Sequence, residues 1–287
     1  MQEPDRAQLP GKYIGSKLQH WLWQGMVDVM AALKFFHSPE DPGLGLGLLI
    51  AAHFDLKPAN VLVDDDGNLI VTDFGQARIE QLRSSGGTYL SAQVGDLNYQ
   101  PPPLGPPVRE LAAGSGSVDE SSWSRAYDVW SMACIVTEVI EYITNGGPDG
   151  FKSFRESRRT EHDSSIAFWK ASPEGGYELR QSVRRTLERF RSHNDRYLNT
   201  VTDLLEVMFS IQPAERPPLS GCLAVILSDV RIDDWPFLDN EEISISDPGT
   251  IPQLRNMLVP TFRPESKKRS LKRVDDVANC LYQAYTV

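Results

Sequence analysis

The chain has 287 residues, of which 40% are hydrophobic and 24% charged, and its formal net charge is −10 at pH 7. This length and hydrophobic content allow one large domain or two modest ones with a sizeable core. The acidic balance excludes a general affinity for nucleic acid, because such affinity depends on a basic surface.

Targeting and redox features are few. Residues 1–18 are polar and lack the apolar core of a signal peptide. The longest apolar run near the front, residues 44–54, contains glycines and a histidine and is too short to span a bilayer. Three scattered cysteines, Cys134, Cys222 and Cys280, do not suit a disulfide framework or a zinc site, so we expect free thiols. The sequence therefore predicts an intracellular, cytoplasmic protein that does not bind a membrane.

The first predicted element is an amphipathic helix over residues 17–37. Its apolar residues recur at helical spacing: Leu18, Leu22, Met26, Val29, Leu33 and Phe36. Residues 38–47 are rich in Pro and Gly and predict a loop. Two β-branched runs follow, Asn60-Val-Leu-Val63 and Leu69-Ile-Val-Thr72. Asp66-Gly67 between them favours a hairpin turn, because Gly accepts positive φ at low cost.

The rest of the chain is predicted to be mostly helical. Residues 76–120 contain many Pro, Gly and Ser residues and predict a long surface segment. Residues 127–143 are apolar nearly all round, which is typical of a helix buried in the centre of a domain. The remaining predictions are a polar loop at 146–176, helices at 177–191, 197–211 and 219–230, and a short helix at 274–285.

Five short motifs occur in an informative order. His53-Phe-Asp-Leu-Lys-Pro-Ala-Asn60 and Asp73-Phe-Gly75 resemble the catalytic loop and the metal-binding loop of protein kinases. Tyr99-Gln-Pro-Pro-Pro103 is similar to the end of a kinase activation segment. Asp128-Val-Trp-Ser131 is similar to the start of the central buried helix, and Arg216-Pro217 to the late arginine of the large lobe. The resemblance covers about 210 residues.

The resemblance implies a role for each matching residue. Asp55 would orient the substrate hydroxyl and accept its proton, and Lys57 would reach the transferred phosphate of ATP. Asn60 and Asp73 would supply oxygen ligands to Mg²⁺, which prefers a few protein oxygens together with phosphates. Asp128 would accept backbone N–H groups and brace the catalytic loop. The implied activity is ATP-dependent phosphorylation of Ser or Thr in a protein substrate.

The implied fold is mainly α: a protein kinase-like large lobe with a short β-hairpin at the catalytic and metal loops. Only about 16 residues precede the first large-lobe helix, so we expect the small β-rich lobe to be missing and the chain to be a truncated form. The expected organisation is a lead-in at residues 1–16, the lobe at 17–230 and a C-terminal extension at 231–287. Without a small lobe, ATP–Mg²⁺ should bind weakly and phosphate transfer should be slow.

Three positions depart from the family pattern. Phe54 replaces the arginine that normally pairs with a phosphorylated activation segment, so such phosphorylation is not expected to be the main switch. Pro103 replaces a glutamate whose usual partner would be Arg216, so a buried ion pair is expected to be lost. Asp96 stands where serine/threonine kinases carry Thr, and a second acid beside Asp55 is expected to disturb the site.

Several alternatives stay open at this point. The chain could be a catalytically inactive, pseudokinase-like interaction module, or its natural start could lie upstream. Aminoglycoside-type phosphotransferases share the His-x-Asp-x-x-x-x-Asn loop but generally lack the other motifs. Two readings of the basic cluster Lys267-Lys-Arg269 with Lys272 and Arg273 are a nuclear localisation signal and a solvated charge run.

Overall fold

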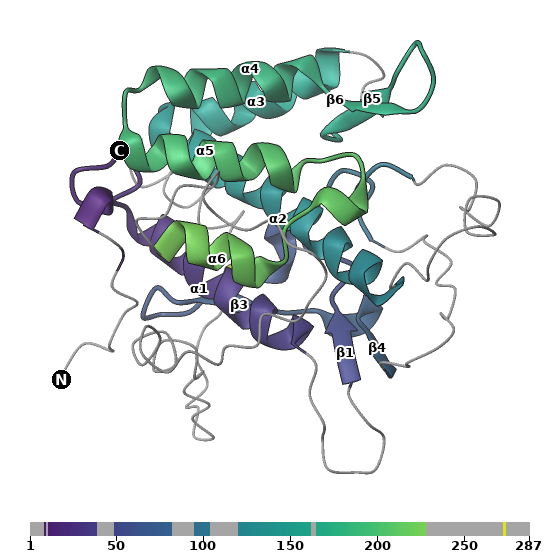
Figure 1. The fold of residues 1–287 in the computed structure, drawn as a ribbon. Helices are drawn as coiled ribbons and strands as arrows, with labels where there is room; N and C mark the ends of the chain where they lie inside the picture. Colours follow the sequence, from purple (N-terminus) through teal and green to yellow (C-terminus); the bar gives the residue numbers. More distant parts are fainter. Residues whose placement is uncertain are drawn as a thin grey trace.

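The computed structural model describes residues 9, 11–38, 49–81, 95–103, 120–161, 165–227 and 272–273. This part of the chain is mostly helical, with three small antiparallel sheets and short 3-10 turns. Figure 1 shows α3 and α4 stacked above α5, α1 beside α6, and α2 running through the middle. No helix among the described residues is long and apolar enough to cross a membrane.

Helix α1 spans Trp21–His37, so it begins four residues later than predicted. The reason is local: the side chain of His20 accepts a hydrogen bond from the backbone N–H of Leu22 and caps the helix. Its buried face rests against α6 and β3. Gly25 permits the close approach, because a Cβ there would lie 2.6 Å from the side chain of Leu69.

The predicted hairpin is confirmed. Strands β2 (Val61–Val63) and β3 (Leu69–Val71) pair antiparallel, and Gly67 takes a φ of 81° in the turn. The carboxylate of Asp64 accepts the N–H groups of Asp66 and Asn68, which stabilises this turn. Strand β7 (Lys272–Arg273) adds to the other edge of β2, with Leu62 opposite Arg273.

A second pair of strands was not predicted. Strands β1 (Leu49–Ala52) and β4 (Arg78–Gln81) pair antiparallel along four residues each. Neither strand alternates apolar and polar residues as a half-buried strand does. Strand β1 is an apolar run that follows a glycine-rich stretch, and β4 is largely polar. Since β1 leads into His53 and β4 follows the Asp73 loop, their pairing holds the two loops of the site together.

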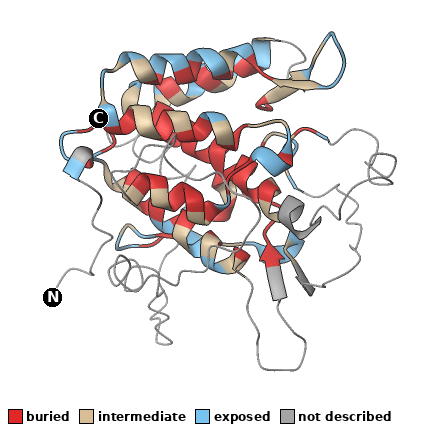
Figure 2. Cartoon of the chain, viewed as in Figure 1, coloured by how far each residue is buried: buried red, intermediate tan, exposed pale blue. Residues whose placement is uncertain are grey.

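Helix α2 (Glu120–Thr144) is the central helix that the sequence predicts. Every residue from 128 to 141 is buried, and Figure 2 shows this helix in red through the middle of the fold. Trp130 is fully buried, with its ring edge-on to Phe209 at a centroid distance of 5.2 Å. The core therefore forms around α2, as expected for a helix that is apolar on all sides.

The region after α2 corrects two predictions. Residues 146–176 are not a loop: they contain α3 (Pro148–Glu161) and β5 (Trp169–Ala171). The helix predicted at 177–191 is present as α4 (Gln181–Ser192), but it begins four residues later, because residues 177–179 form β6 (Tyr177–Leu179). Helix α3 escaped detection because Arg158, a charged residue, occupies its buried face together with Phe154.

The last two helices match the prediction. Helix α5 spans Arg196–Met208 and α6 spans Leu219–Leu227. Asp195 caps α5 and also accepts the hydroxyl of Ser16 and the backbone N–H of Lys17, while Tyr13 packs edge-on against Tyr197. The stretch predicted as a lead-in thus includes residues that pack on the helices.

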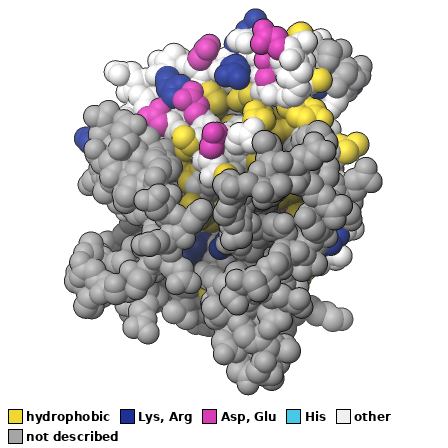
Figure 3. Space-filling model, turned by 45° about the vertical axis from the view of Figure 1, so that its right-hand side comes forward, with side chains coloured by type: hydrophobic (Ala, Val, Ile, Leu, Met, Phe, Trp, Pro, Cys, Tyr) yellow, Lys and Arg dark blue, Asp and Glu magenta, His cyan; other side chains and the backbone are white. Residues whose placement is uncertain are grey.

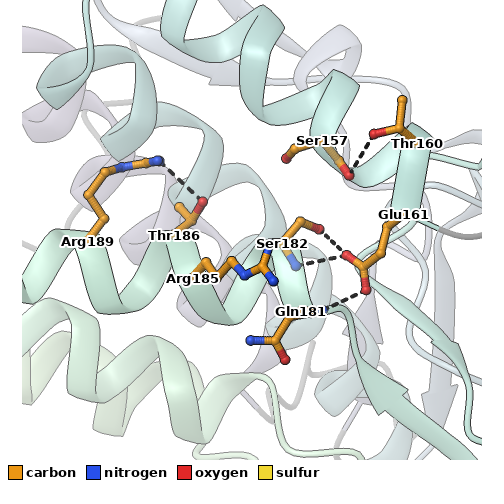
Figure 4. Close-up of a pocket in the computed structure, with 8 residues that line it drawn as sticks. All are labelled: Ser157, Thr160, Glu161, Gln181, Ser182, Arg185, Thr186 and Arg189. Atoms are coloured by element: carbon orange, nitrogen blue, oxygen red, sulfur yellow. Dashed lines mark hydrogen bonds between the residues drawn. The ribbon is translucent and has the colours of Figure 1, made fainter.

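A cavity of about 360 Å³ lies between α3 and α4, and none of its lining residues belongs to the loop after β1. Figure 4 shows Glu161 on its wall, where the carboxylate accepts the backbone N–H groups of Gln181 and Ser182 and caps α4. On the face drawn in Figure 3, described side chains of both charge signs lie close together at the end of the molecule that carries these helices. Residues 39–47 of the predicted loop, the predicted helix at 274–285 and most of 76–120 lie outside the described residues.

Candidate active site

The loop after β1 is braced by Asp128 from α2. The carboxylate of Asp128 accepts the backbone N–H groups of His53 at 2.6 Å and Phe54 at 2.9 Å, as the sequence predicted. His37 at the end of α1 places its Nε2 2.8 Å from the same carboxylate. Phe54 has a φ of 63°, a costly conformation for a residue with a bulky side chain. The two hydrogen bonds hold the loop in this conformation.

Three predicted site residues lie together on this loop. Nζ of Lys57 lies 2.8 Å from Oδ2 of Asp55, and Nδ2 of Asn60 donates to the same oxygen at 3.0 Å. Asn60 also donates to the carbonyl oxygen of Asp55 at 2.8 Å. Asp55 is buried to 8% exposure, whereas the side chain of Lys57 retains 24%. A carboxylate and an ammonium group are thus held side by side at the edge of the lobe.

The fourth predicted residue, Asp73, follows β3 and is exposed. It adopts the left-handed conformation with a φ of 61°, and its carboxylate accepts the N–H of Gly75 at 3.3 Å. The two loops are linked through the backbone, because the N–H of Thr72 donates to the carbonyl of Asn60 at 2.9 Å. Asp73 therefore lies next to this cluster, and among the described residues its carboxylate bonds to Gly75 and not to Asp55.

These residues fit a magnesium ion bound together with ATP. The amide nitrogen of Asn60 is used by Asp55, which leaves its oxygen as the available ligand atom. The carboxylate of Asp73 is exposed and retains lone pairs beyond its bond to Gly75. One amide and one carboxylate oxygen are a suitable protein contribution for Mg²⁺, which takes its other ligands from phosphates and water.

His53 has a structural environment. It is fully buried, its Nε2 lies 3.0 Å from the carbonyl oxygen of Thr72, and its Nδ1 accepts the N–H of Asp55 at 3.3 Å. The ring of Phe74 packs 4.9 Å from the His53 ring and 5.4 Å from Phe36, yet Phe74 remains 49% exposed. The site therefore ends in an aromatic group that is only half covered by described residues.

Asp96 does not meet Asp55 in the way the sequence suggested. Its backbone N–H donates to Oδ1 of Asp55 at 3.0 Å, while its own carboxylate accepts the backbone and side-chain N–H groups of Asn98 at 2.9 and 2.8 Å. The carboxylate of Asp96 thus caps a local turn, and a backbone dipole, not a second acid, makes the hydrogen bond to Asp55.

Arg216 has no carboxylate partner among the described residues, in agreement with the expected loss of an ion pair. It donates to the backbone carbonyls of Ser210, Ala126 and Ile211, and its guanidinium lies 5.0 Å from the ring centre of Trp130. Burial lowers the pKa of Arg216 to about 9. Backbone carbonyls have taken the place of the missing glutamate.

A buried polar network around Glu138 escaped the sequence analysis. Glu138 on α2 accepts the hydroxyl of Tyr99 at 2.8 Å and pairs with Arg155 and Arg158 from α3. Burial would raise the pKa of Glu138, but the positive charges of Arg158 and Arg155 outweigh it and lower the pKa. Two glutamates, Glu138 and Glu141, inside a mostly apolar stretch were the available sequence signal, because buried carboxylates need partners.

Comparisons with known proteins agree with the motifs. The protein kinase domain family matches residues 17–225. Over 231 residues the chain is 26% identical to a cyclin-dependent kinase C-1 of Oryza sativa subsp. japonica, which covers 79% of this chain and 39% of the relative. It is 32% identical to a Caenorhabditis elegans cyclin-dependent kinase 2 over 139 residues, or 48% of the chain and 29% of the relative.

A third relative is a mitogen-activated protein kinase 5 of Arabidopsis thaliana, 28% identical over 244 residues, with 77% of this chain and 52% of the relative covered. The chain thus spans about a third to a half of the length of these curated relatives. Cyclin-dependent and mitogen-activated protein kinases are classed as serine/threonine protein kinases. The protein kinase family as a whole uses ATP and Mg²⁺. The chain belongs to the protein kinase domain family.

Proposed function

We propose that this protein transfers a phosphoryl group from ATP to Ser or Thr residues of a protein substrate. The observation that carries the proposal is the cluster in which Lys57 and Asn60 both bond to Oδ2 of Asp55. The cluster is built by a buried aspartate, Asp128, that fixes the loop backbone. Such positioning matters in phosphoryl transfer, because the protein contributes mainly orientation and charge neutralisation.

In this proposal, Asp55 orients the substrate hydroxyl and accepts its proton at a carboxylate oxygen. Lys57 places a positive charge toward the transferred phosphate, where negative charge must be neutralised. Asn60 and Asp73 hold the Mg²⁺ that accompanies ATP, and the ion would neutralise charge on the phosphates. Lys57 favours Ser or Thr over Tyr as acceptor by its resemblance to the catalytic loop of serine/threonine kinases.

The proposed division of labour along the chain follows the predicted organisation. Residues 17–230 form the kinase lobe with the site, and residues 231–287 form a C-terminal extension that carries the basic cluster. The pairing of β7 with β2 supports a contact between this extension and the lobe. We propose a cytoplasmic location, with nuclear import as the alternative function of the basic cluster.

A radiolabelled phosphate assay on the longest natural form that contains residues 1–287 tests the proposal. We expect Asp55→Ala to lower the transfer rate about 10²–10⁴-fold, the range for loss of a general base. Asp65→Ala, a change at an exposed aspartate of the hairpin turn, is the control and should retain the parent rate. Full transfer by Asp55→Ala, with other kinases excluded, would show that Asp55 is not the base.

The second candidate is a non-catalytic interaction module. It is favoured by the departures at Phe54 and Pro103 and by Arg216, which has no carboxylate partner among the described residues. Isothermal titration with ATP–Mg²⁺ separates the two candidates. In the longest natural form that contains residues 1–287, an enzyme binds the nucleotide and Asp73→Ala weakens that binding, whereas a module of the second kind shows no heat of binding in either form.

A further inference from the structure

The turn at residues 95–100 is physically joined to the proposed base. The carbonyl oxygen of Asp96 accepts the N–H groups of Tyr99 at 2.9 Å and Gln100 at 3.1 Å, which closes the turn. The N–H of Asp96 then donates to Oδ1 of Asp55 at 3.0 Å. The position of the turn therefore determines whether one of the two oxygens of the Asp55 carboxylate is held.

The near side of the turn lies directly on Phe54. Gly95 has a φ of 103°, and a Cβ at this position would lie 2.4 Å from the carbonyl oxygen of Phe54 and 2.8 Å from the hydroxyl of Tyr127. Only glycine fits this approach. The ring of Phe54 is buried and packs 5.1 Å from the ring of Tyr127. By the resemblance to protein kinases, this apolar side chain occupies the position of an arginine that would pair with a phosphate on the activation segment.

The far side of the turn is held by three other elements. From α2, Ser131 donates its hydroxyl to the carbonyl of Tyr99 at 2.8 Å. The hydroxyl of Tyr99 in turn donates to Glu138 at 2.8 Å and accepts from Arg155 of α3. From β5, Nε1 of Trp169 donates to the carbonyl of Gln100 at 3.0 Å.

The Tyr99 hydroxyl remains a hydrogen-bond donor over a wide pH range. Tyr99 is buried to 5% exposure, and burial together with the charge of Glu138 raises its pKa well above the ordinary value. The hydroxyl therefore stays protonated throughout the physiological range. None of these bonds requires a phosphate group.

We propose that Tyr99 and Trp169 are positioning residues that clamp the 95–100 turn onto α2 and β5 without phosphorylation, and thereby hold Asp55 in place. The importance of Asp55 rests on the proposed function, but the clamp itself is a property of the fold. It replaces the arginine–phosphate contact that Phe54 cannot make. The clamp also gives the β5–β6 hairpin, an element far from the catalytic loop in sequence, a role at the site.

Hydrogen–deuterium exchange on the full chain tests the clamp. Trp169→Phe keeps an aromatic ring against Tyr177 but removes the N–H that reaches Gln100. Because a lost hydrogen bond makes local opening easier, exchange of the amides of Asp96 and Gln100 should rise about three- to tenfold. Tyr99→Phe should give a rise of similar size at the same amides. Amides of α5 should exchange at the parent rate in both variants.

The matched control is Trp21→Phe, which changes another half-buried indole, at the start of α1, where the ring stacks against His20. It should leave exchange at Asp96 unchanged. The clamp is refuted if Trp169→Phe and Tyr99→Phe both exchange like this control. It is also refuted if phosphatase treatment of the parent alone raises exchange at Asp96 as much, since a phosphate would then hold the turn.

A kinetic arm links the clamp to the chemistry. In a form that transfers phosphate, Trp169→Phe should lower kcat about three- to tenfold and leave KM for ATP unchanged, because Asp55 is loosened while the nucleotide ligands are not. A rise in KM for ATP with unchanged kcat would contradict the positioning role. Absence of transfer in the parent would count against the proposed function and leave the exchange result to decide on the clamp.

Discussion

Replacement of Asp128 by alanine should release the catalytic loop and destabilise the whole lobe. The carboxylate accepts three buried hydrogen bonds, from His53, Phe54 and His37. Each bond to a charged group contributes about 1.5–3 kcal/mol, and relaxation of the strained backbone at Phe54 returns about 1–3 kcal/mol. The net loss in the free energy of unfolding should therefore be about 2–8 kcal/mol.

Urea denaturation gives the free energy, and hydrogen exchange at the amides of His53 and Phe54 shows whether the loop opens first. Asp128→Asn keeps one oxygen acceptor and should lie between the parent and Asp128→Ala. Asp149→Ala, at an exposed aspartate in the first turn of α3, is the control and should cost less than about 1 kcal/mol. A parent-like unfolding curve for Asp128→Ala, with both amides still protected, would refute the bracing role.

Two further predictions concern the core and the response to acid. Trp130→Ala should cost about 3–5 kcal/mol through the cavity beside Phe209, and a parent-like thermal melt would contradict the burial of this residue. Burial alone would raise the pKa values of Glu138 and Asp195. The positive charges of nearby arginines at Glu138, and the backbone N–H groups that bond to Asp195, outweigh burial and lower both pKa values. The ionised carboxylates stabilise the folded protein. For Glu138 this stabilisation is fully present above pH 4.5, the ordinary pKa of Glu, and it is lost as the pH falls through the lower pKa of the folded state. Glu138→Gln should flatten the fall in melting temperature below pH 4.5, and an unchanged slope would show that Glu138 does not contribute.

The helices that could be predicted are those whose buried faces consist of apolar residues, because the spacing of these residues can be read from the sequence. Residues 127–143 of α2 are apolar nearly all round, so their burial followed from composition. Helix α3 was missed because Arg158 fills the place of an apolar residue, with its guanidinium 4.1 Å from the ring centres of both Phe154 and Phe168. Strands β1 and β4 were missed because their stability comes from pairing with each other across a stretch of chain, not from their own composition.

At the site, the motif predicted which side chains lie on the loop but not how they are supported. The bond between Lys57 and Asp55 follows from their spacing in a tight loop. The contact from Asp96 is made by a backbone N–H, so no choice of side chain could have revealed it. His37 was counted as the end of a helix, and its contact with Asp128 depends on the packing of α1 against α2.

Strand β7 has a practical consequence for handling the protein. Because Lys272 and Arg273 pair with β2, that strand is the middle member of a three-stranded sheet. A clone cut after α6 would leave one edge of β2 with bare N–H and C=O groups, next to the turn that carries Asn60. Such an edge invites pairing with another chain. The truncated protein would therefore tend to self-associate through β2, beside the site. Inhibitor screens run on it would then measure binding to a site partly covered by a second molecule.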